Sequence, residues 1–289
     1  MHKLICADWK EGIQMAGDDY YACAFADPPD NLGLKYDGYD DNLSKDDYYI
    51  LLKDLVYWMV TVAGVSWISY NSRWTDIMGV IVNDIIKGSS IGLEAKHCVQ
   101  TFTFGQHNKY DLGSGYRPIW RLRWPNAPLY PDQIRIESER QRTGDKRANP
   151  AGRVPSDVFD FPRVTGNSHQ RCQWHPTQLN EELIERCIKL SSVRGGRVLD
   201  PFAGTGTVLR VCRRIGRWST NFEISAKYCE KIAEENEMEA VDVDSASAFL
   251  RCRSCQGRIV RLRENYATCK EGCGKVIPLQ GQIPTYVLS

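Results

Sequence analysis

The tetrapeptide Asp27-Pro28-Pro29-Asp30 combines two carboxylates with two consecutive prolines, directly after the small-residue run 22–26. Proline has no N–H and a fixed φ, so this segment holds carbonyl and carboxylate oxygens as acceptors in fixed positions. Such acceptors suit a site that receives N–H groups from a bound molecule. An ordinary proline turn is the alternative that the motif alone leaves open.

A second candidate site is the run Asp200-Pro201-Phe202-Ala203-Gly204-Thr205-Gly206-Thr207, between a predicted strand and a predicted helix. Glycines let backbone N–H groups approach a bound nucleotide, and the start of a helix carries a positive partial charge. Glu223 ends the next predicted strand, where an acidic residue in a Rossmann-like fold binds ribose hydroxyls. The spacing indicates a βαβ nucleotide site, with helix capping by Glu223 as the alternative.

Four of the eleven cysteines form two close pairs. Two residues separate Cys252 from Cys255, three separate Cys269 from Cys273, and the segment between the pairs predicts a hairpin. Four thiolates in two pairs suit a tetrahedral structural Zn²⁺ site. We therefore interpret residues 246–289 as a zinc-ribbon module, with four unrelated free cysteines as the alternative. Such a module binds nucleic acid or protein, or stabilises a domain with a small core.

Short apolar runs alternate with segments of helical periodicity, which predicts a parallel sheet covered by helices. The expected strands are 4–7, 22–26, 65–70, 98–104, 197–199 and 218–222. The expected helices are 45–62, 74–87, 179–188, 207–215 and 226–236. Prolines and arginines over about 125–172 indicate an irregular insertion. The expected fold class is α/β, with a Rossmann-like domain over residues 1–245.

The composition is that of a globular protein, with 42% hydrophobic and 25% charged residues in a chain of 289. It excludes a mainly disordered, collagen-like or coiled-coil chain. The longest uncharged stretch, 55–72, contains polar residues and a glycine, and no signal peptide is recognisable. The odd number of cysteines argues against a fully paired disulfide framework. We therefore expect a cytoplasmic protein without membrane association.

The net charge of +1 does not by itself predict a polyanionic partner, because 37 basic residues nearly balance 36 acidic ones. The distribution is uneven, however. Residues 117–171 contain 11 basic and 6 acidic side chains, and residues 250–275 contain 7 basic and 2 acidic ones. This asymmetry permits two basic faces on a nearly neutral protein.

The order and spacing of these motifs resemble the DNA amino-methyltransferases of the permuted β group, in which the catalytic tetrapeptide precedes the cofactor loop. The matching segments cover most of residues 4–236. They include the run Trp174-His175-Pro176-Thr177-Gln178 ahead of an apolar helix, and Asn221-Phe222-Glu223-Ile224-Ser225. The resemblance implies a methyltransferase of Rossmann-like fold, with S-adenosylmethionine as cofactor and DNA as substrate.

The resemblance also implies roles for individual residues. Asp27 and the Pro28 carbonyl would accept the hydrogens of the exocyclic amino group of a flipped base, aiming the nitrogen lone pair at the methyl group. The cofactor would lie against the glycine loop, with Glu223 on the ribose and Asp8 near the adenine ring. The residues implied to bind it are Asp8, His175, Thr177, Asp200, Phe202, Gly204, Gly206, Thr207 and Glu223.

Two positions depart from the resembled family. The fourth residue of the tetrapeptide is usually an aromatic that stacks on the flipped base, whereas the carboxylate of Asp30 cannot stack. Either Tyr36 or Tyr39 replaces that aromatic, or Asp30 adds a hydrogen bond, or the target differs. Further along, Leu179-Asn180 stand where the family has Lys-Pro, which we interpret as drift.

An aspartate at the first tetrapeptide position resembles adenine-N6 enzymes, so we expect adenine N6 as the target. Cytosine N4 is the alternative, because both bases present an exocyclic amino group. The resemblance makes the insertion a candidate target-recognition segment. Candidate DNA contacts are Arg117, Arg121, Arg123, Arg140 and Arg142. For any single arginine, a solvated surface position is the alternative.

Three other functions stay open from the sequence. The first is a DNA-binding protein without catalysis. The second is a methyltransferase that acts on RNA or on a modified base. A dinucleotide oxidoreductase is disfavoured, because it leaves Asp27–Asp30 without a role. A bacterial or phage origin, implied by the resemblance, makes a restriction endonuclease a candidate partner.

Overall fold

The centre of the protein is a ten-stranded sheet with the order β6-β4-β5-β3-β2-β7-β8-β1-β13-β9. The computed structural model describes residues 1–11, 20–89, 92–103 and 108–241, and then the strand residues 259–263, 266–269, 276–278 and 285–288. The strands of the sheet are β1 (His2–Cys6), β2 (Tyr21–Ala26), β3 (Ala63–Ser69), β4 (Glu94–Thr101), β5 (Tyr116–Arg123), β6 (Val158–Asp160), β7 (Arg197–Asp200), β8 (Trp218–Glu223), β9 (Glu239–Val241) and β13 (Thr285–Leu288).

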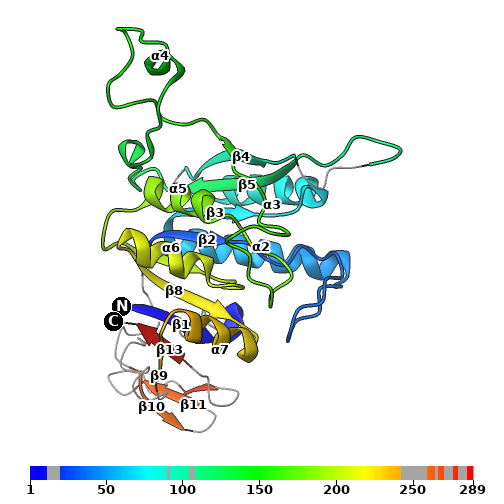
Figure 1. Ribbon diagram of the computed structural model, residues 1–289. Helices are drawn as coiled ribbons and strands as arrows, with labels where there is room; N and C mark the ends of the chain where they lie inside the picture. Colours follow the sequence, from blue (N-terminus) through cyan, green and yellow to red (C-terminus); the bar gives the residue numbers. More distant parts are fainter. Residues whose placement is uncertain are drawn as a thin grey trace.

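Helices cover both faces of this sheet, which gives three layers (Figure 1). One face packs on α2 (Lys45–Val62) and α3 (Thr75–Gly88). The other packs on α5 (Glu181–Ser191), α6 (Thr207–Ile215) and α7 (Ala226–Glu235). The connections contain the short helices η1 (Ser72–Trp74), η2 (Pro131–Ile134) and α4 (Glu139–Arg142). The predicted α/β fold is confirmed, and no helix in the described part of the chain could span a membrane.

Strand β2 lies at the centre because both of its faces are apolar. Cys23 and Phe25 pack among the side chains of α5 and α6, whereas Ala24 and Ala26 pack toward α2. All four side chains are at most 1% exposed. A strand buried on both faces is typical of a parallel α/β sheet, and it carries the tetrapeptide at its carboxyl end.

The central strands run parallel and the outer ones do not. Strands β3, β2, β7, β8 and β1 are parallel neighbours, so their carboxyl ends meet at one edge. Strand β5 runs antiparallel to β3 and to β4, so its first residue lies at that same edge. In open α/β sheets, ligands bind beyond the carboxyl ends of the parallel strands. The edge is therefore where the sequence motifs should converge.

The insertion forms an arm that projects from the body and carries α4 (Figure 1). Reciprocal backbone hydrogen bonds of 2.9 Å between Ile136 and Arg153 close its base. Ser138 and Gln141 cap α4 reciprocally. The insertion is less irregular than expected, because its residues Val158–Asp160 form β6 and extend the sheet beside β4.

After residue 241, the structure describes a small antiparallel sheet of β10 (Ile259–Arg263), β11 (Tyr266–Cys269) and β12 (Val276–Pro278). Strand β13 then pairs with β1 and β9 in the main sheet. The last strand of the proposed zinc-ribbon module is therefore shared with the large sheet. Cys252, Cys255 and Cys273, like the Cys269 side chain, lie outside the described residues, so the zinc site stays a prediction.

Candidate active site

The carboxyl ends of four strands bring together residues from distant parts of the sequence. Asp27 follows β2, Asp200 ends β7, Glu223 ends β8 and Asp8 follows β1. These residues line one cavity of about 480 Å³. The predicted catalytic and cofactor motifs thus meet in a single site.

The carbonyl groups of the tetrapeptide differ in their partners. The Tyr48 hydroxyl donates to the Pro29 carbonyl, and the Trp74 ring N–H donates to the Asp30 carbonyl, both at 2.7 Å. Tyr48 is buried in α2, so these bonds tie the tetrapeptide to the helical layer. Among the described residues, no hydrogen bond reaches the Pro28 carbonyl, which therefore stays available as an acceptor.

Arg117, at the start of β5, binds both carboxylates of the tetrapeptide. Its Nη2 donates to Oδ1 of Asp27 at 2.6 Å, and Nη1 and Nη2 donate to the two oxygens of Asp30 at 2.8 and 3.0 Å. Its Nε donates to the Ser69 hydroxyl at 2.6 Å. All but one of its N–H donors are thereby used inside the site. The structure places this candidate DNA contact among the predicted catalytic residues.

The charges in this cluster affect one another. Burial raises the pKa of Asp27, the charge of Arg117 lowers it, and the like charge of Asp30 raises it again. Burial alone would lower the pKa of Arg117, but the two carboxylates hold it above its ordinary value. The arginine is therefore charged throughout the working pH range. Ionised, the three side chains sum to one negative charge, the same as a lone aspartate.

The glycine loop is shaped by its own backbone and by the neighbouring strands. Gly204 and Gly206 have φ values of +55° and +73°, which a residue with a side chain rarely adopts. Gly204 faces the cavity, and its N–H donates to Oε2 of Glu223 at 2.8 Å. Gly206 packs instead against Ile232 of α7 and precedes α6. Gly204 thus faces the cavity, and Gly206 supports the loop.

Two buried carboxyl groups beside this loop have altered acidity. Burial raises the pKa of Asp200 to about 8, although the N–H of Phe202 donates to it. Burial likewise raises the pKa of Glu223 to about 7, although the N–H groups of Ser225 and Gly204 donate to it. Buried carboxyl groups without a cation beside them favour a positively charged ligand, because that ligand stabilises their ionised form.

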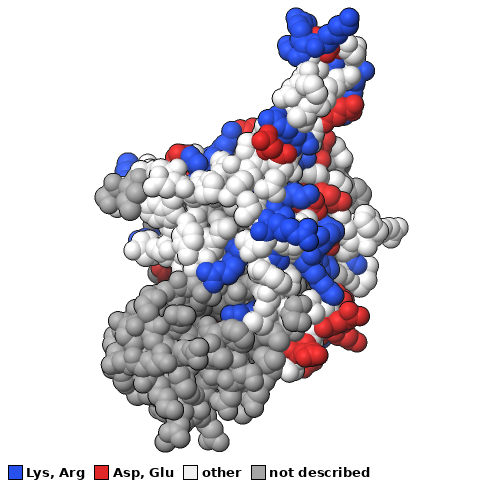
Figure 2. Space-filling view, turned by 90° about the vertical axis from the view of Figure 1, so that its left-hand side faces the viewer, with Lys and Arg blue, Asp and Glu red and all other residues white. Residues whose placement is uncertain are grey.

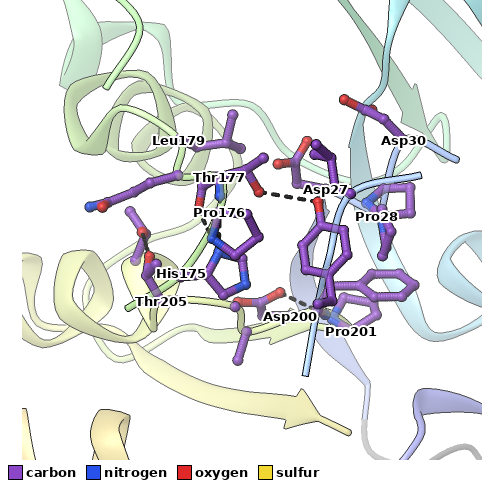
Figure 3. A pocket seen from close by; sticks show the side chains of 18 of the residues that line it. Asp27, Pro28, Asp30, His175, Pro176, Thr177, Leu179, Asp200, Pro201 and Thr205 are labelled. Atoms are coloured by element: carbon purple, nitrogen blue, oxygen red, sulfur yellow. Dashed lines mark hydrogen bonds between the residues drawn. The ribbon is translucent and has the colours of Figure 1, made fainter. Parts of the chain in front are cut away.

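The run before α5 forms the wall opposite the tetrapeptide, as Figure 3 shows for His175, Pro176 and Thr177. Nδ1 of His175 lies 2.6 Å from the Thr177 carbonyl, so this nitrogen carries the proton. Burial lowers the pKa of His175 to about 4, which leaves the ring neutral. The Thr177 hydroxyl lies 3.4 Å from that of Tyr36. His175 and Thr177 are thus placed at the cavity as predicted.

Asn180, which we interpreted from the sequence as drift from the resembled family, has a structural role. Its side chain accepts the N–H groups of Glu182 and Leu183 and caps α5. Asparagine is among the best capping residues, so this helix starts correctly without the family's proline. The departure at Leu179-Asn180 therefore preserves the helix that follows His175.

The loop from 31 to 43 closes another side of the cavity. The carboxylate of Asp41 accepts the N–H groups of Asn31, Leu32 and Leu34 at 2.8 to 3.1 Å. This loop carries Tyr36 into the cavity. Sequence reasoning missed Asp41 and Ser69, because a lone acidic or hydroxyl residue has no distinctive spacing.

Three further residues predicted to bind the cofactor lie at the same cavity. Asp8, Thr207 and Phe202 line the cavity, and the Phe202 ring lies 6.2 Å from that of Trp9. Among the residues that the structure describes, no group of three potential ligands could hold a metal ion.

The other candidate DNA-contacting arginines lie outside the cavity. Arg123 forms a bidentate pair with Glu94, and Arg121 has a buried Nε for which the described residues offer no partner. Arg140 and Arg142, on α4, are 67% and 61% exposed.

Comparisons with known proteins identify a family and several relatives. The DNA methylase family model N6_N4_Mtase matches residues 21–235. The type II methyltransferase M.HpaI of Haemophilus parainfluenzae is 28% identical over 264 residues, covering 84% of this chain and 76% of that protein. The DNA adenine methyltransferase YhdJ of Escherichia coli is 31% identical over 217 residues, covering 71% of this chain and 72% of that protein. M.ScaI of Streptomyces caespitosus is 36% identical over 128 residues, but only 40% of its length is covered.

Solved structures share the fold. The M1.HpyAVI complex with S-adenosylmethionine has a TM-score of 0.54 and 15% identity, covering 81% of this chain and all of that one. The cytosine-N4-specific PvuII DNA methyltransferase has a TM-score of 0.57 and 14% identity, covering 80% of this chain and 84% of that one. The family match, the relative from Escherichia coli and the shared fold lead to one conclusion: this chain belongs to the N6/N4 family of DNA methylases and is an S-adenosylmethionine-dependent DNA methyltransferase.

Proposed function

We propose that this chain methylates the exocyclic amino group of a base flipped out of DNA, with adenine N6 as the target. The observation that carries the proposal is the position of two acceptors, the Asp27 carboxylate and the Pro28 carbonyl. They lie in the same cavity as Gly204 and Glu223. Direct transfer from a bound methyl donor requires this adjacency of acceptor pair and nucleotide loop. The tetrapeptide precedes the glycine loop, so we assign the chain to the permuted β group.

The groups that line the cavity fit S-adenosylmethionine. When bound, this cofactor supplies an electrophilic methyl group on a positively charged sulfur. Buried Asp200 and Glu223 favour such a cation, and Glu223 also suits ribose hydroxyls. Gly204 lets the backbone approach the ligand. The further residues that we assign to cofactor binding are Asp8, His175, Thr177, Phe202 and Thr207, with Gly206 supporting the loop.

The chain contributes orientation and charge to the reaction. Asp27 and the Pro28 carbonyl accept the two amino hydrogens, which turns the nitrogen lone pair out of the base plane. Tyr48 occupies the Pro29 carbonyl, so that group does not compete for the amino hydrogens. The raised pKa of Asp27 makes its carboxylate a better acceptor for the proton that leaves the methylated nitrogen.

The test is to incubate the protein with methyl-labelled S-adenosylmethionine and unmodified genomic DNA, and to identify the labelled nucleoside by mass spectrometry. We expect label in N6-methyladenine, and its loss in Asp27→Ala. Lys231→Ala, which alters an exposed ion pair on α7, is the matched control that keeps full activity. Label in N4-methylcytosine would retain the mechanism and change the base. A parallel reaction contains RNA in place of DNA. Label in RNA alone, or DNA binding without transfer, would support the two alternatives raised by Asp30.

The choice of adenine rests on Asp27 and on the relatives. The relative from Escherichia coli bears the name DNA adenine methyltransferase, whereas the PvuII enzyme of similar fold is cytosine-N4-specific. The fold therefore accommodates either base. The aspartate at the first tetrapeptide position favours adenine.

We propose that the insertion selects the DNA target. Figure 2 shows basic side chains at the tip of its projecting arm, mixed with acidic ones. Arg140 and Arg142 are the exposed arginines of α4 that we assign to phosphate contacts. These two arginines also form ion pairs, Arg140 with Asp145 and Arg142 with Glu137 and Glu139, but they are exposed. Arg121 and Arg123 are part-buried and therefore stay weaker candidates.

We also propose that Cys252, Cys255, Cys269 and Cys273 bind one structural Zn²⁺. The paired spacing supports this, and so does the small antiparallel sheet of β10, β11 and β12 in the same segment. Elemental analysis of the purified protein should give one zinc per chain. Replacing Cys252 and Cys255 by serine should abolish zinc binding. Zinc retained by that double variant would contradict the proposed zinc site.

The type II methyltransferases among the relatives support a restriction endonuclease as a partner in the cell. Both proteins would then act on the same DNA sequence in the cytoplasm. Methylated DNA resistant to a restriction enzyme of that specificity is the expected result.

A further inference from the structure

The fourth tetrapeptide residue is an aspartate where an aromatic was expected, and the structure shows what Asp30 contacts. Both of its oxygens accept from the guanidinium of Arg117, at 2.8 and 3.0 Å. The same guanidinium donates to Asp27 at 2.6 Å. The side chain of Asp30 is 13% exposed, so this is a partly buried, bidentate ion pair and not a surface contact.

Bidentate pairing and the bond to Ser69 leave Arg117 with one orientation. An arginine bound to two carboxylates and a hydroxyl cannot rotate without breaking several charge-assisted hydrogen bonds. It therefore fixes Oδ1 of Asp27, and Ser69, which also interacts with this carboxylate, adds to the restraint. Asp30 also neutralises the added positive charge, so the cluster keeps the single negative charge that the reaction uses.

We propose that Arg117, clamped by Asp30 and Ser69, is a positioning residue that holds the Asp27 carboxylate in place for the target amino group. This inference rests on the proposed methyl transfer and deepens it. Asp30 then has a function without stacking on the base, because it orients the arginine that orients the catalytic carboxylate.

Opposite electrostatic effects of the two partners make the proposal testable. Arg117 lowers the pKa of Asp27, and Asp30 raises it. Removing the arginine should therefore move the acidic limb of the kcat profile to higher pH. Removing the charge of Asp30 should move it to lower pH. The groups that face Asp27 from the surrounding elements are Arg117, Asp30, Ser69, Tyr36 and Asp200.

The experiment measures kcat against pH at saturating S-adenosylmethionine and DNA, so that cofactor-side groups are equally occupied in every variant. For Arg117→Met we expect about a 100-fold lower kcat and an acidic limb about 1 to 3 units higher. For Asp30→Asn we expect a limb shifted to lower pH. Arg117→Lys keeps the charge but loses the fork, so kcat should fall while the limb stays near its original place.

Arg214→Met is the matched control. Arg214 also joins two carboxylates, those of Glu181 and Glu185, but it lies on α6 and does not line the cavity. It should lower thermal stability without moving the limb. An unmoved limb in Arg117→Met, shifts of one sign in Arg117→Met and Asp30→Asn, or an equal shift in Arg214→Met would overturn the proposal. Absence of transfer by the unaltered protein would refute the proposed function instead.

Discussion

The backbone N–H of Gly204 donates to the Glu223 carboxylate at 2.8 Å, joining the glycine loop after β7 to the end of β8. The loop is thus preformed around a buried acid whose pKa is raised to about 7. Asp200, with its pKa raised to about 8, lies at the start of the same loop. Cofactor binding at this loop should therefore be linked to protons.

Binding of S-adenosylmethionine at pH 7 should release protons. Asp200 is largely protonated and Glu223 about half protonated at that pH, and a cationic ligand lowers both pKa values. Calorimetry in buffers of different ionisation enthalpy measures the number released. Asp200→Asn should reduce it, and S-adenosylhomocysteine, which lacks the sulfonium charge, should release fewer. A binding enthalpy independent of the buffer would contradict the prediction.

The two loop glycines should respond differently to alanine. Gly206→Ala places a Cβ 2.9 Å from Ile232 at a φ of +73°, so we expect a loss of about 1–2 kcal/mol of stability. Gly204→Ala has a nearest contact of 3.4 Å, on the His175 ring, and its Cβ enters the cavity wall. Its larger effect should be weaker cofactor affinity. Chemical unfolding and cofactor titration of both variants separate the two effects, and identical profiles would refute the distinction.

Acid should weaken the fold through His2. Burial lowers its pKa to about 4, whereas in the unfolded chain the value is 6.5. The unfolded chain therefore binds the proton first, and the contribution of His2, up to about 3 kcal/mol, is present above pH 6.5 and lost as pH falls toward 4. His2→Phe should flatten this loss in urea midpoints measured between pH 7 and 5. His169→Phe, at an exposed position, is the control that should keep the original slope.

The exposed arginines of α4 should contribute to DNA affinity through phosphates. Each phosphate contact adds about one to the slope of log K against log salt, so Arg140→Gln with Arg142→Gln should reduce that slope by about 2. Filter binding at several salt concentrations measures it. Lys231→Gln on α7 should leave the slope as it is. An unchanged slope in the double variant would exclude these two contacts.

Most secondary structure was predictable because the buried strands and amphipathic helices have clear periodicity. The expected helices 45–62 and 207–215 match α2 and α6 to the residue. The positions of the two main motifs were also predictable, because each directly follows a central parallel strand. The C-terminal strand β13 was not predicted to join the main sheet, because nothing in its local sequence specifies a partner as distant as β1.

The position of Arg117 could not be derived from the alternation of arginines along its strand. Alternation assigns residues to a face, but not to an end of the sheet. Strand β5 runs antiparallel to β3, with Ile119 opposite Ser69 and Arg123 opposite Val65. Arg117 therefore reaches the catalytic edge, while Arg123 lies at the other end. The orientation of β5 depends on tertiary pairing that one sequence does not reveal.

The sheet order also has a consequence for synthesis on the ribosome. Strands β1 and β2 leave the ribosome early, yet Cys23 pairs with Val198 and Lys3 with Thr220. The catalytic tetrapeptide is thus translated long before the strands that flank its site. Contacts between such distant segments slow folding and expose unpaired strand edges meanwhile. We therefore expect the nascent chain to fold late and to depend on chaperones until β8 has emerged.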